Sequence, residues 1–254
     1  MTWDPSTYLA FGNERTRPAI ELASRIPVTD PPVVVDLGCG PGNSTAILAQ
    51  RWPTARFIGV DNSEEMLTAA RKTQLNAEWQ RADLATWSTS AKVPVIFSNA
   101  AYQWVDGHDK IFPRLMSLLE PKGALAIQMP RNFDAPSHVI LRELASSGPW
   151  AAKVARFNRA HPVASPSAYY TMLSAHAAAV DIWETEYQQA LDGEDAVLKW
   201  VSGTALVPYV AALEVEERKD FLNAYRDRLA RAYPREASGK TLFPFKRIFI
   251  VATR

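Results

Sequence analysis

The fold of this 254-residue chain is decided by the stretch VVVDLGCGPGNST, residues 33–45. Its apolar, β-branched beginning is typical of a strand that is buried on both faces in the middle of a parallel sheet. Alternating glycines follow Asp36, and we expect a helix from about Ser44. Glycine permits positive φ and a close approach of the backbone to a ligand. Since the N–H groups of such a loop and helix start suit a polar head group, we predict a binding site here.

Two cofactor classes use a loop of this kind. The dinucleotide-binding fingerprint needs glycine at its first, third and sixth positions, and the sixth position here is Asn43. This departure argues against a nicotinamide cofactor, and a glycine-rich turn without a ligand is a further alternative. The residues DLGCGPG, 36–42, resemble motif I of the class I S-adenosylmethionine (SAM) methyltransferases over the whole length of that motif.

The resemblance implies a Rossmann-like SAM methyltransferase fold. This fold is α/β, with a doubly wound, seven-stranded, mostly parallel sheet and a helical lid made from insertions. The implied cofactor is S-adenosyl-L-methionine, whose methionine part the loop would hold. The cofactor-binding candidates in the loop are Asp36, Gly38, Cys39, Gly40 and Asn43. We expect the Cys39 side chain to be a small buried filler rather than a nucleophile, because no histidine is near it in sequence.

Composition limits the class of protein. Lys+Arg 28 against Asp+Glu 27 gives a net charge of +1. The chain therefore lacks the excess positive charge that is typical of proteins that bind nucleic acid. We expect neither a membrane span nor a signal peptide, because the chain has no run of 18 apolar residues and does not open with a basic and then an apolar segment. The single cysteine excludes an internal disulfide and a thiolate metal cluster. We therefore predict a cytoplasmic protein without metal, nucleic acid or membrane partner; the oligomeric state stays open.

A second strand is predicted at residues 55–61, with Asp61 at its carboxyl end. A carboxylate at this spacing after the glycines is suited to accept hydrogen bonds from both ribose hydroxyls. The alternative role for Asp61 is a helix cap, but Ser63 already fits that position. Asn62 and Met66 complete the cofactor candidates of this segment, and Met66 would pack either on an adenine ring or in the core.

A third strand and its exit are predicted at residues 77–84, and a fourth strand within residues 93–104, with its carboxyl end at Asn99 to Trp104. Asp83 and Leu84 resemble the pair with which the family reads adenine, a carboxylate for the exocyclic amine and a backbone N–H for a ring nitrogen. The carboxyl end of the following strand lies where open α/β sheets place their chemistry. Asn99 and Ala100 would therefore meet the methionyl part of the cofactor. Trp104 would form a wall of the substrate site or pack on the next helix.

The resemblance also divides the chain. We predict N-terminal helices over the cofactor at 1–30, the first of them capped by Asp4, and a SAM-binding core at 31–130. A helical lid insertion follows at 131–168, and residues 169–254 complete the sheet around a second helical insertion at about 190–235. Pro208 is expected to interrupt the helices of that second insertion.

Further motifs extend the resemblance along nearly the whole chain. The motifs WDPSxY (3–8), NAxxQW (99–104), QMP (128–130) and VDIW (180–183), where x is any residue, resemble the bacterial members of this family that methylate trans-aconitate. The implied reaction is SAM-dependent esterification of one carboxylate of trans-aconitate, or of a similar small polycarboxylate, to a monomethyl ester. Because a carboxylate is already ionised at pH 7, attack on a methyl group needs no general base. We expect a positioning mechanism with no catalytic acid or base.

A small anionic substrate requires cations, and guanidinium groups bind carboxylates bidentately. Lys and Arg outnumber Asp and Glu in residues 131–161, although a solvated helix face would look the same. The substrate-binding candidates are Arg15, Trp104, Arg131, Arg156 and Arg159. Two alternatives stay open at this point: a methyltransferase of another small molecule (a phenol, amine or carbon nucleophile), and a SAM-binding protein without catalysis.

Overall fold

The computed structural model describes residues 16–158 and 162–254. Their contacts form two compact units. The first unit contains residues 16–130, 162–184 and 248–254, and the second contains residues 131–158 and 185–247. The expected helix start at Asp4 and the candidates Arg15 and Arg159 lie outside the described residues.

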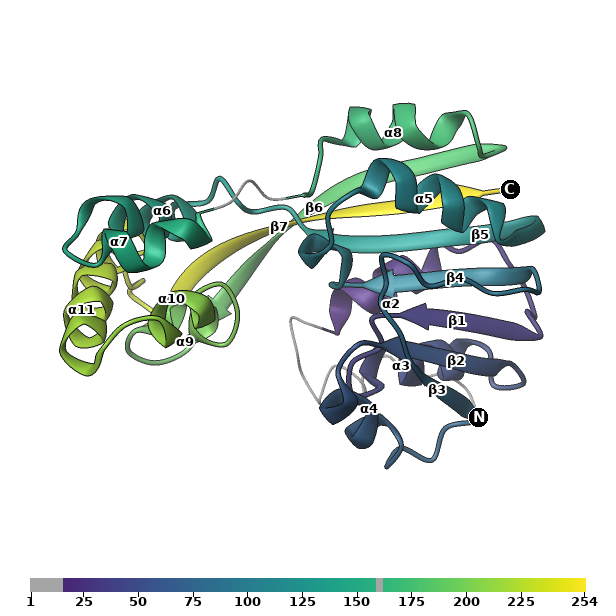
Figure 1. Cartoon of the computed structure of the whole chain (residues 1–254), viewed down its shortest axis with the longest axis horizontal. Helices are drawn as coiled ribbons and strands as arrows, with labels where there is room; N and C mark the ends of the chain where they lie inside the picture. The colour runs from purple at the N-terminus through teal and green to yellow at the C-terminus, as the bar shows by residue number, and fades with distance from the viewer. Residues whose placement is uncertain (1–15, 159–161) are drawn as a thin grey trace. The chain divides into compact units, whose positions relative to one another are not determined.

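A seven-stranded sheet in the order β3-β2-β1-β4-β5-β7-β6 forms the framework (Figure 1). The pairs β1–β2, β1–β4, β2–β3 and β4–β5 are parallel, and β7 runs opposite to β5, with the Lys122 N–H donating to the Arg254 carbonyl. The predicted doubly wound, mostly parallel sheet is therefore confirmed. Its strands are β1 (Val33–Leu37), β2 (Arg56–Asp61), β3 (Ala77–Arg81), β4 (Val93–Asn99), β5 (Leu119–Pro130), β6 (Ala179–Leu191) and β7 (Thr241–Thr253).

The register of the central strands brings the predicted site residues to one edge of the sheet. Asp36 of β1 pairs with Gly59 of β2 and Phe97 of β4, so these three strands end close to one another. The strand order reverses between β1 and β4, which is the position where open α/β sheets bind ligands.

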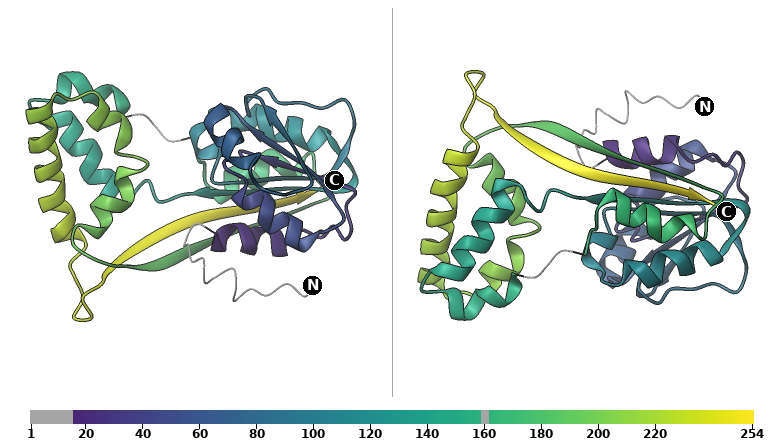
Figure 2. Two further views of the ribbon diagram at one scale, coloured as in Figure 1. Left: turned by 90° about the horizontal axis from the view of Figure 1, so that it is seen from below. Right: turned by 90° about the horizontal axis from the view of Figure 1, so that it is seen from above.

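Helices cover both faces of the sheet in the first unit. The helix α2, which contacts α3, lies on one face, and α5, which contacts α8, lies on the other (Figure 2). The helices of this unit are α2 (Arg17–Ser24), α3 (Asn43–Arg51), α4 (Glu64–Ala70), the 3₁₀ turn η1 (Tyr102–Trp104), α5 (His108–Ser117) and α8 (Pro166–Ser174).

The second unit has a hydrophobic core of its own. Trp150 packs edge-on against Phe221, with ring centroids 5.1 Å apart, and Tyr225 is fully buried in the same core. The long helix α11 contacts both α6 and α9. Its helices are α6 (Pro136–Ser147), α7 (Ala151–Val154), the 3₁₀ turn η2 (Ala155–Phe157), α9 (Ala196–Ser202), α10 (Val207–Ala211) and α11 (Val215–Ala232).

Two local expectations differ from the structure. Pro208 lies in the first turn of α10 rather than between helices, because proline lacks only an N–H group that needs no partner there. The helix α8 contacts α5, with Tyr169 bonded to His108, so residues 162–168 of the predicted 131–168 insertion group with the first unit. Among the described residues, no helix has both the length and the apolar character needed to cross a bilayer.

Candidate functional site

Asp36 lies at the start of the glycine loop with its side chain fully buried. Its Oδ2 accepts hydrogen bonds from Ser44 Oγ (2.7 Å) and Thr45 Oγ1 (2.6 Å) at the start of α3. Burial raises the pKa of Asp36 to about 6, although these two hydrogen bonds act in the opposite direction. The carboxyl group therefore fastens the loop to α3, a role for Ser44 and Thr45 that the sequence motif did not reveal. A direct contact between Asp36 and the cofactor stays a prediction.

The loop glycines differ in what surrounds them. Gly38 has a φ of +79°, and a Cβ there would lie 2.2 Å from the Cβ of Ala101. Gly40 has a φ of +54°, but a Cβ there would meet no described heavy atom within 4 Å. The backbone at Gly40 is thus open on the side where a ligand would approach. Between them Cys39 is buried and burial raises the pKa of its thiol, which agrees with a packing role.

Asp61 connects the glycine loop to the end of β2. Its Oδ2 accepts a hydrogen bond from the Gly40 N–H and its Oδ1 accepts one from the Ser63 N–H, both at 2.9 Å. A carboxylate has about four acceptor positions, so the group retains capacity for ribose hydroxyls. Ser63 Oγ accepts from the Met66 N–H and caps α4, as predicted.

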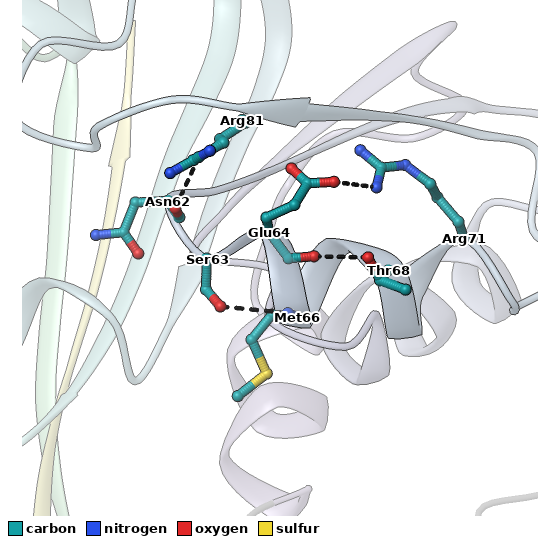
Figure 3. Close-up of polar contacts among 7 residues, drawn as sticks. All are labelled: Asn62, Ser63, Glu64, Met66, Thr68, Arg71 and Arg81. Carbon is teal, nitrogen blue, oxygen red and sulfur yellow. Dashed lines mark hydrogen bonds and ion pairs between the residues drawn. The ribbon is translucent and has the colours of Figure 1, made fainter.

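Asn62 and Met66 are exposed residues around the start of α4 (Figure 3). The Asn62 carbonyl accepts a hydrogen bond from Arg81 Nε at 3.3 Å. Met66 is 43% exposed, which excludes the alternative that its side chain belongs to the core. An exposed thioether in the first turn of α4 is suited to pack on an aromatic ring, so the adenine contact remains the prediction for Met66.

Asp83 and Leu84 form the turn after β3. Asp83 is exposed and its Oδ1 accepts from the Ala85 N–H at 2.8 Å, while the Leu84 side chain is buried. Arg114 of α5 donates from Nη2 to the Ala85 carbonyl at 2.8 Å and from Nη1 to the Trp87 carbonyl. Arg114 thus holds the predicted adenine turn, and nothing in the local sequence pattern pointed to it.

The turn after β4 has an unusual backbone. Ala100 has a φ of +55°, its N–H donates to the Gln128 carbonyl at 2.9 Å, and its carbonyl accepts from Gln103 Nε2 at 2.6 Å. Asn99 Oδ1 and Gln103 Oε1 are buried and have no hydrogen-bond partner among the described residues. Because an unpartnered buried oxygen is costly, these two amides are suited to accept from a ligand donor such as an ammonium group.

The aromatic residues of η1 have different environments. Tyr102 is fully buried and packs edge-on against Phe112 of α5, with ring centroids 5.2 Å apart. The Tyr102 side chain therefore packs against α5 rather than lining the site. Trp104 is 55% exposed and stays a candidate wall of the substrate site.

The second unit holds the two described arginine candidates. Arg131 directly follows β5 and is half-buried. Arg156 is exposed, with its guanidinium carbon 5.0 Å from the centroid of the Phe157 ring. These positions leave the substrate roles of Arg131 and Arg156 as predictions.

Comparison with the amino-acid sequences of known proteins shows which family the chain resembles. Residues 34–123 match a family described as a methyltransferase domain. Full-length relatives carry the name trans-aconitate 2-methyltransferase. The Azoarcus sp. protein is 48% identical, covering 100% of this chain and 99% of the relative. The Rhodopseudomonas palustris (strain BisB18) protein is 45% identical with 99% of both chains covered, and the Variovorax paradoxus protein is 43% identical with 100% and 99% covered.

Solved structures share the fold at low sequence identity. The YcgJ protein of Bacillus subtilis superposes with a TM-score of 0.58 at 16% identity, covering 94% of this chain and 98% of that chain. A phosphoethanolamine N-methyltransferase of Haemonchus contortus, solved with S-adenosylhomocysteine, gives 0.54 at 13% identity, covering 93% of this chain and 52% of that chain.

The open backbone at Gly40, the acid after β2 and the unpartnered amides after β4 fit SAM, and the matched domain agrees. The protein is a SAM-dependent methyltransferase with S-adenosyl-L-methionine as its cofactor. Identity of 43–48% over the full length places it more narrowly, and the chain belongs to the trans-aconitate 2-methyltransferase family.

Proposed function

We propose that this enzyme methylates one carboxylate of trans-aconitate, or of a closely similar small polycarboxylate, and releases a monomethyl ester. The observation that carries the proposal is its full-length identity of 43–48% to relatives of that name. We place the reaction in the cytoplasm, because a chain with a single cysteine forms no internal disulfide. Its balanced charge gives no reason to add a nucleic-acid partner.

In this proposal the carboxyl ends of the strands hold the parts of the cofactor in order. When bound, SAM supplies a methyl group activated by a sulfonium centre. Backbone groups of the glycine loop, with Asn99 and Ala100, would hold the methionyl part, and Asp61 the ribose hydroxyls. The adenine ring would lie against Met66 and Asn62, with Asp83 and Leu84 reading its edge. The cofactor residues proposed are Asp36, Gly38, Cys39, Gly40, Asn43, Asp61, Asn62, Met66, Asp83, Leu84, Asn99 and Ala100.

The acceptor carboxylate needs no proton removed before it attacks. The enzyme's contribution is therefore to align the carboxylate with the methyl group and to remove water from it. Holding two reactants in line lowers a barrier by about 7–11 kcal/mol in favourable cases. Asp36 and Cys39 are not bases for this step, because both are buried and serve the loop itself.

We propose that Arg15, Arg131, Arg156 and Arg159 supply the cations for the substrate carboxylates and that Trp104 forms a wall of the same site. Replacing an arginine that binds a carboxylate by alanine should raise KM for the acid about ten- to a hundredfold, since a charge-assisted hydrogen bond contributes about 1.5–3 kcal/mol. Steady-state kinetics of the four single variants tests this. Arg231→Ala, at an exposed position of α11, is the control. Wild-type KM values in all four variants would contradict the proposal that these arginines bind the substrate carboxylates.

Methyl transfer from labelled SAM to a panel of organic acids, phenols and amines tests the reaction itself. We expect labelled ester with trans-aconitate, identified by mass spectrometry, and little product with phenols or amines. Transfer to a phenol or amine instead would favour the broader alternative. Cofactor binding without transfer to any acceptor would favour a non-catalytic SAM-binding protein.

A further inference from the structure

A cavity of about 260 Å³ lies inside the second unit, at the start of α6. Three segments distant in sequence form it: the residues after β5, β6, and the stretch from the end of α11 to β7. The lining residues that matter for its chemistry are Arg131, Asn132, Asp134, Glu186, Tyr233 and Lys246.

The amide of Asn132 is the feature that needs an explanation. The residue is 5% exposed, and within the described chain neither Oδ1 nor Nδ2 has a hydrogen-bond partner. Leaving a buried polar group unpaired costs about 1–3 kcal/mol, so an apolar side chain of the same size would be more stable here. A polar residue at such a position in a cavity wall indicates a ligand that completes its hydrogen bonds.

The charges around the cavity favour an anion. Arg131 and Lys246 are half-buried, whereas Asp134 and Glu186 are exposed. Glu186 also accepts a hydrogen bond from Gln188 Nε2 at 3.0 Å. Because solvent and salt screen exposed charges more strongly than half-buried ones, the two cations dominate inside the cavity.

We propose that this cavity binds a carboxylate of the polycarboxylate substrate, with Asn132 Nδ2 and Lys246 Nζ as donors and Arg131 adding positive charge. Asn132 Oδ1 then accepts from a water molecule. The inference rests on the proposed function, because it assigns a site to the acid of that reaction. It adds Asn132 and Lys246 to the arginine candidates, and neither stands out in the sequence.

Asn132→Leu and Lys246→Met test the proposal in the full-length enzyme. We expect Asn132→Leu to raise KM for trans-aconitate at least tenfold, to leave KM for SAM within twofold, and to leave Tm unchanged or raised. That combination separates a binding role from a structural one, because loss of a structural hydrogen bond lowers Tm. Asn223→Leu, at an exposed position of α11, is the matched control and should change neither KM.

If ester still forms and both variants keep the wild-type KM for the acid, the cavity assignment is wrong while the proposed function stands. If the wild-type enzyme esterifies no acid, the proposed function is wrong. Calorimetric titration of trans-aconitate into the wild type and the variant then still tests whether the cavity binds the acid. Equal Kd values for trans-aconitate in the wild type and the variant would overturn the assignment. Should Asn132→Leu not fold, Asn132→Asp keeps the size and adds negative charge. It should weaken acid binding still further, and unchanged binding would contradict the proposal.

Discussion

The buried carboxyl group of Asp36 makes the stability of the folded protein depend on pH. Its pKa rises from an ordinary 3.8 to about 6, because burial disfavours the charged form. The folded state therefore binds this proton more tightly than the unfolded state. Its contribution to stability is complete below about pH 4 and is lost as the pH rises through about 6, a change of about 3 kcal/mol.

Asp36→Asn removes this dependence. An asparagine oxygen still accepts from Ser44 and Thr45, but the side chain carries no charge to bury. At pH 8 we expect the variant to have a free energy of unfolding about 1–3 kcal/mol above that of the wild type. At pH 4.5 the difference should be much smaller. Urea unfolding at both pH values measures it, and an equal difference at both would show that the charge is not the cause.

Alanine substitutions at Gly38 and Gly40 should have two different effects, one mainly on stability and the other mainly on cofactor binding. Gly38→Ala adds a Cβ against Ala101 at 2.2 Å and forces alanine to positive φ, so we expect a loss of about 2–4 kcal/mol in stability. Gly40→Ala meets no described atom and should cost only about 1–2 kcal/mol for its φ. Its Cβ would instead occupy the side of the loop where the cofactor approaches, raising the Kd for SAM at least tenfold.

Thermal unfolding and calorimetric titration with SAM separate these two effects. A Gly40→Ala protein that binds SAM as tightly as the wild type would show that the loop does not contact the cofactor.

At the scale of elements, α5 acts as a brace between two turns of the site. His108 is buried, and its pKa is lowered by burial, so the ring is neutral. Nε2 must donate to the Tyr102 carbonyl at 2.9 Å, and Nδ1 accepts from the Tyr169 hydroxyl at 2.7 Å. Six residues further along the same helix, Arg114 holds the turn after β3. The same helix thus supports η1 and the predicted adenine turn.

Arg114→Met keeps most of the side-chain volume and removes both donors. We expect the Kd for SAM to rise about tenfold, because the turn that carries Asp83 and Leu84 loses its two anchors. KM for the acid should change little. Lys110→Met, at an exposed position of the same helix, is the control. Equal SAM affinity in the two variants, measured by calorimetry, would contradict the bracing role.

At the scale of the whole molecule, contacts between residues distant in sequence assemble each unit. The second unit joins residues 131–158 to residues 185–247, and its core includes side chains from both segments. Tyr225 of α11 donates a hydrogen bond to the Ser137 carbonyl of α6 at 2.9 Å, and the Ser137 N–H donates to the Tyr233 hydroxyl at 3.1 Å. These bonds span some ninety residues of chain and shape the start of α6, where the cavity lined by Asn132 lies.

The seven-stranded sheet was expected from the resemblance to the methyltransferases. The sequence alone determined the central buried strand, the glycine loop and the cap at Ser63. These features follow from local causes: a β-branched run buried on both faces, glycine's access to positive φ, and a hydroxyl one turn before the N–H it caps. The sequence identified Trp104 and Met66 as candidate site residues, but only the structure showed that both side chains are exposed.

The features that only the tertiary structure decided depend on which groups meet after folding, whether 8 residues apart, as for Asp36 and Ser44, or 29 residues apart, as for Ala85 and Arg114. The anchoring of Asp36, the bracing by Arg114 and the unpartnered amide of Asn132 have no local signature. Each one follows from which groups surround a side chain once the chain has folded. Patterning specifies which face of an element is buried, whereas packing alone specifies whether a buried polar group finds a partner.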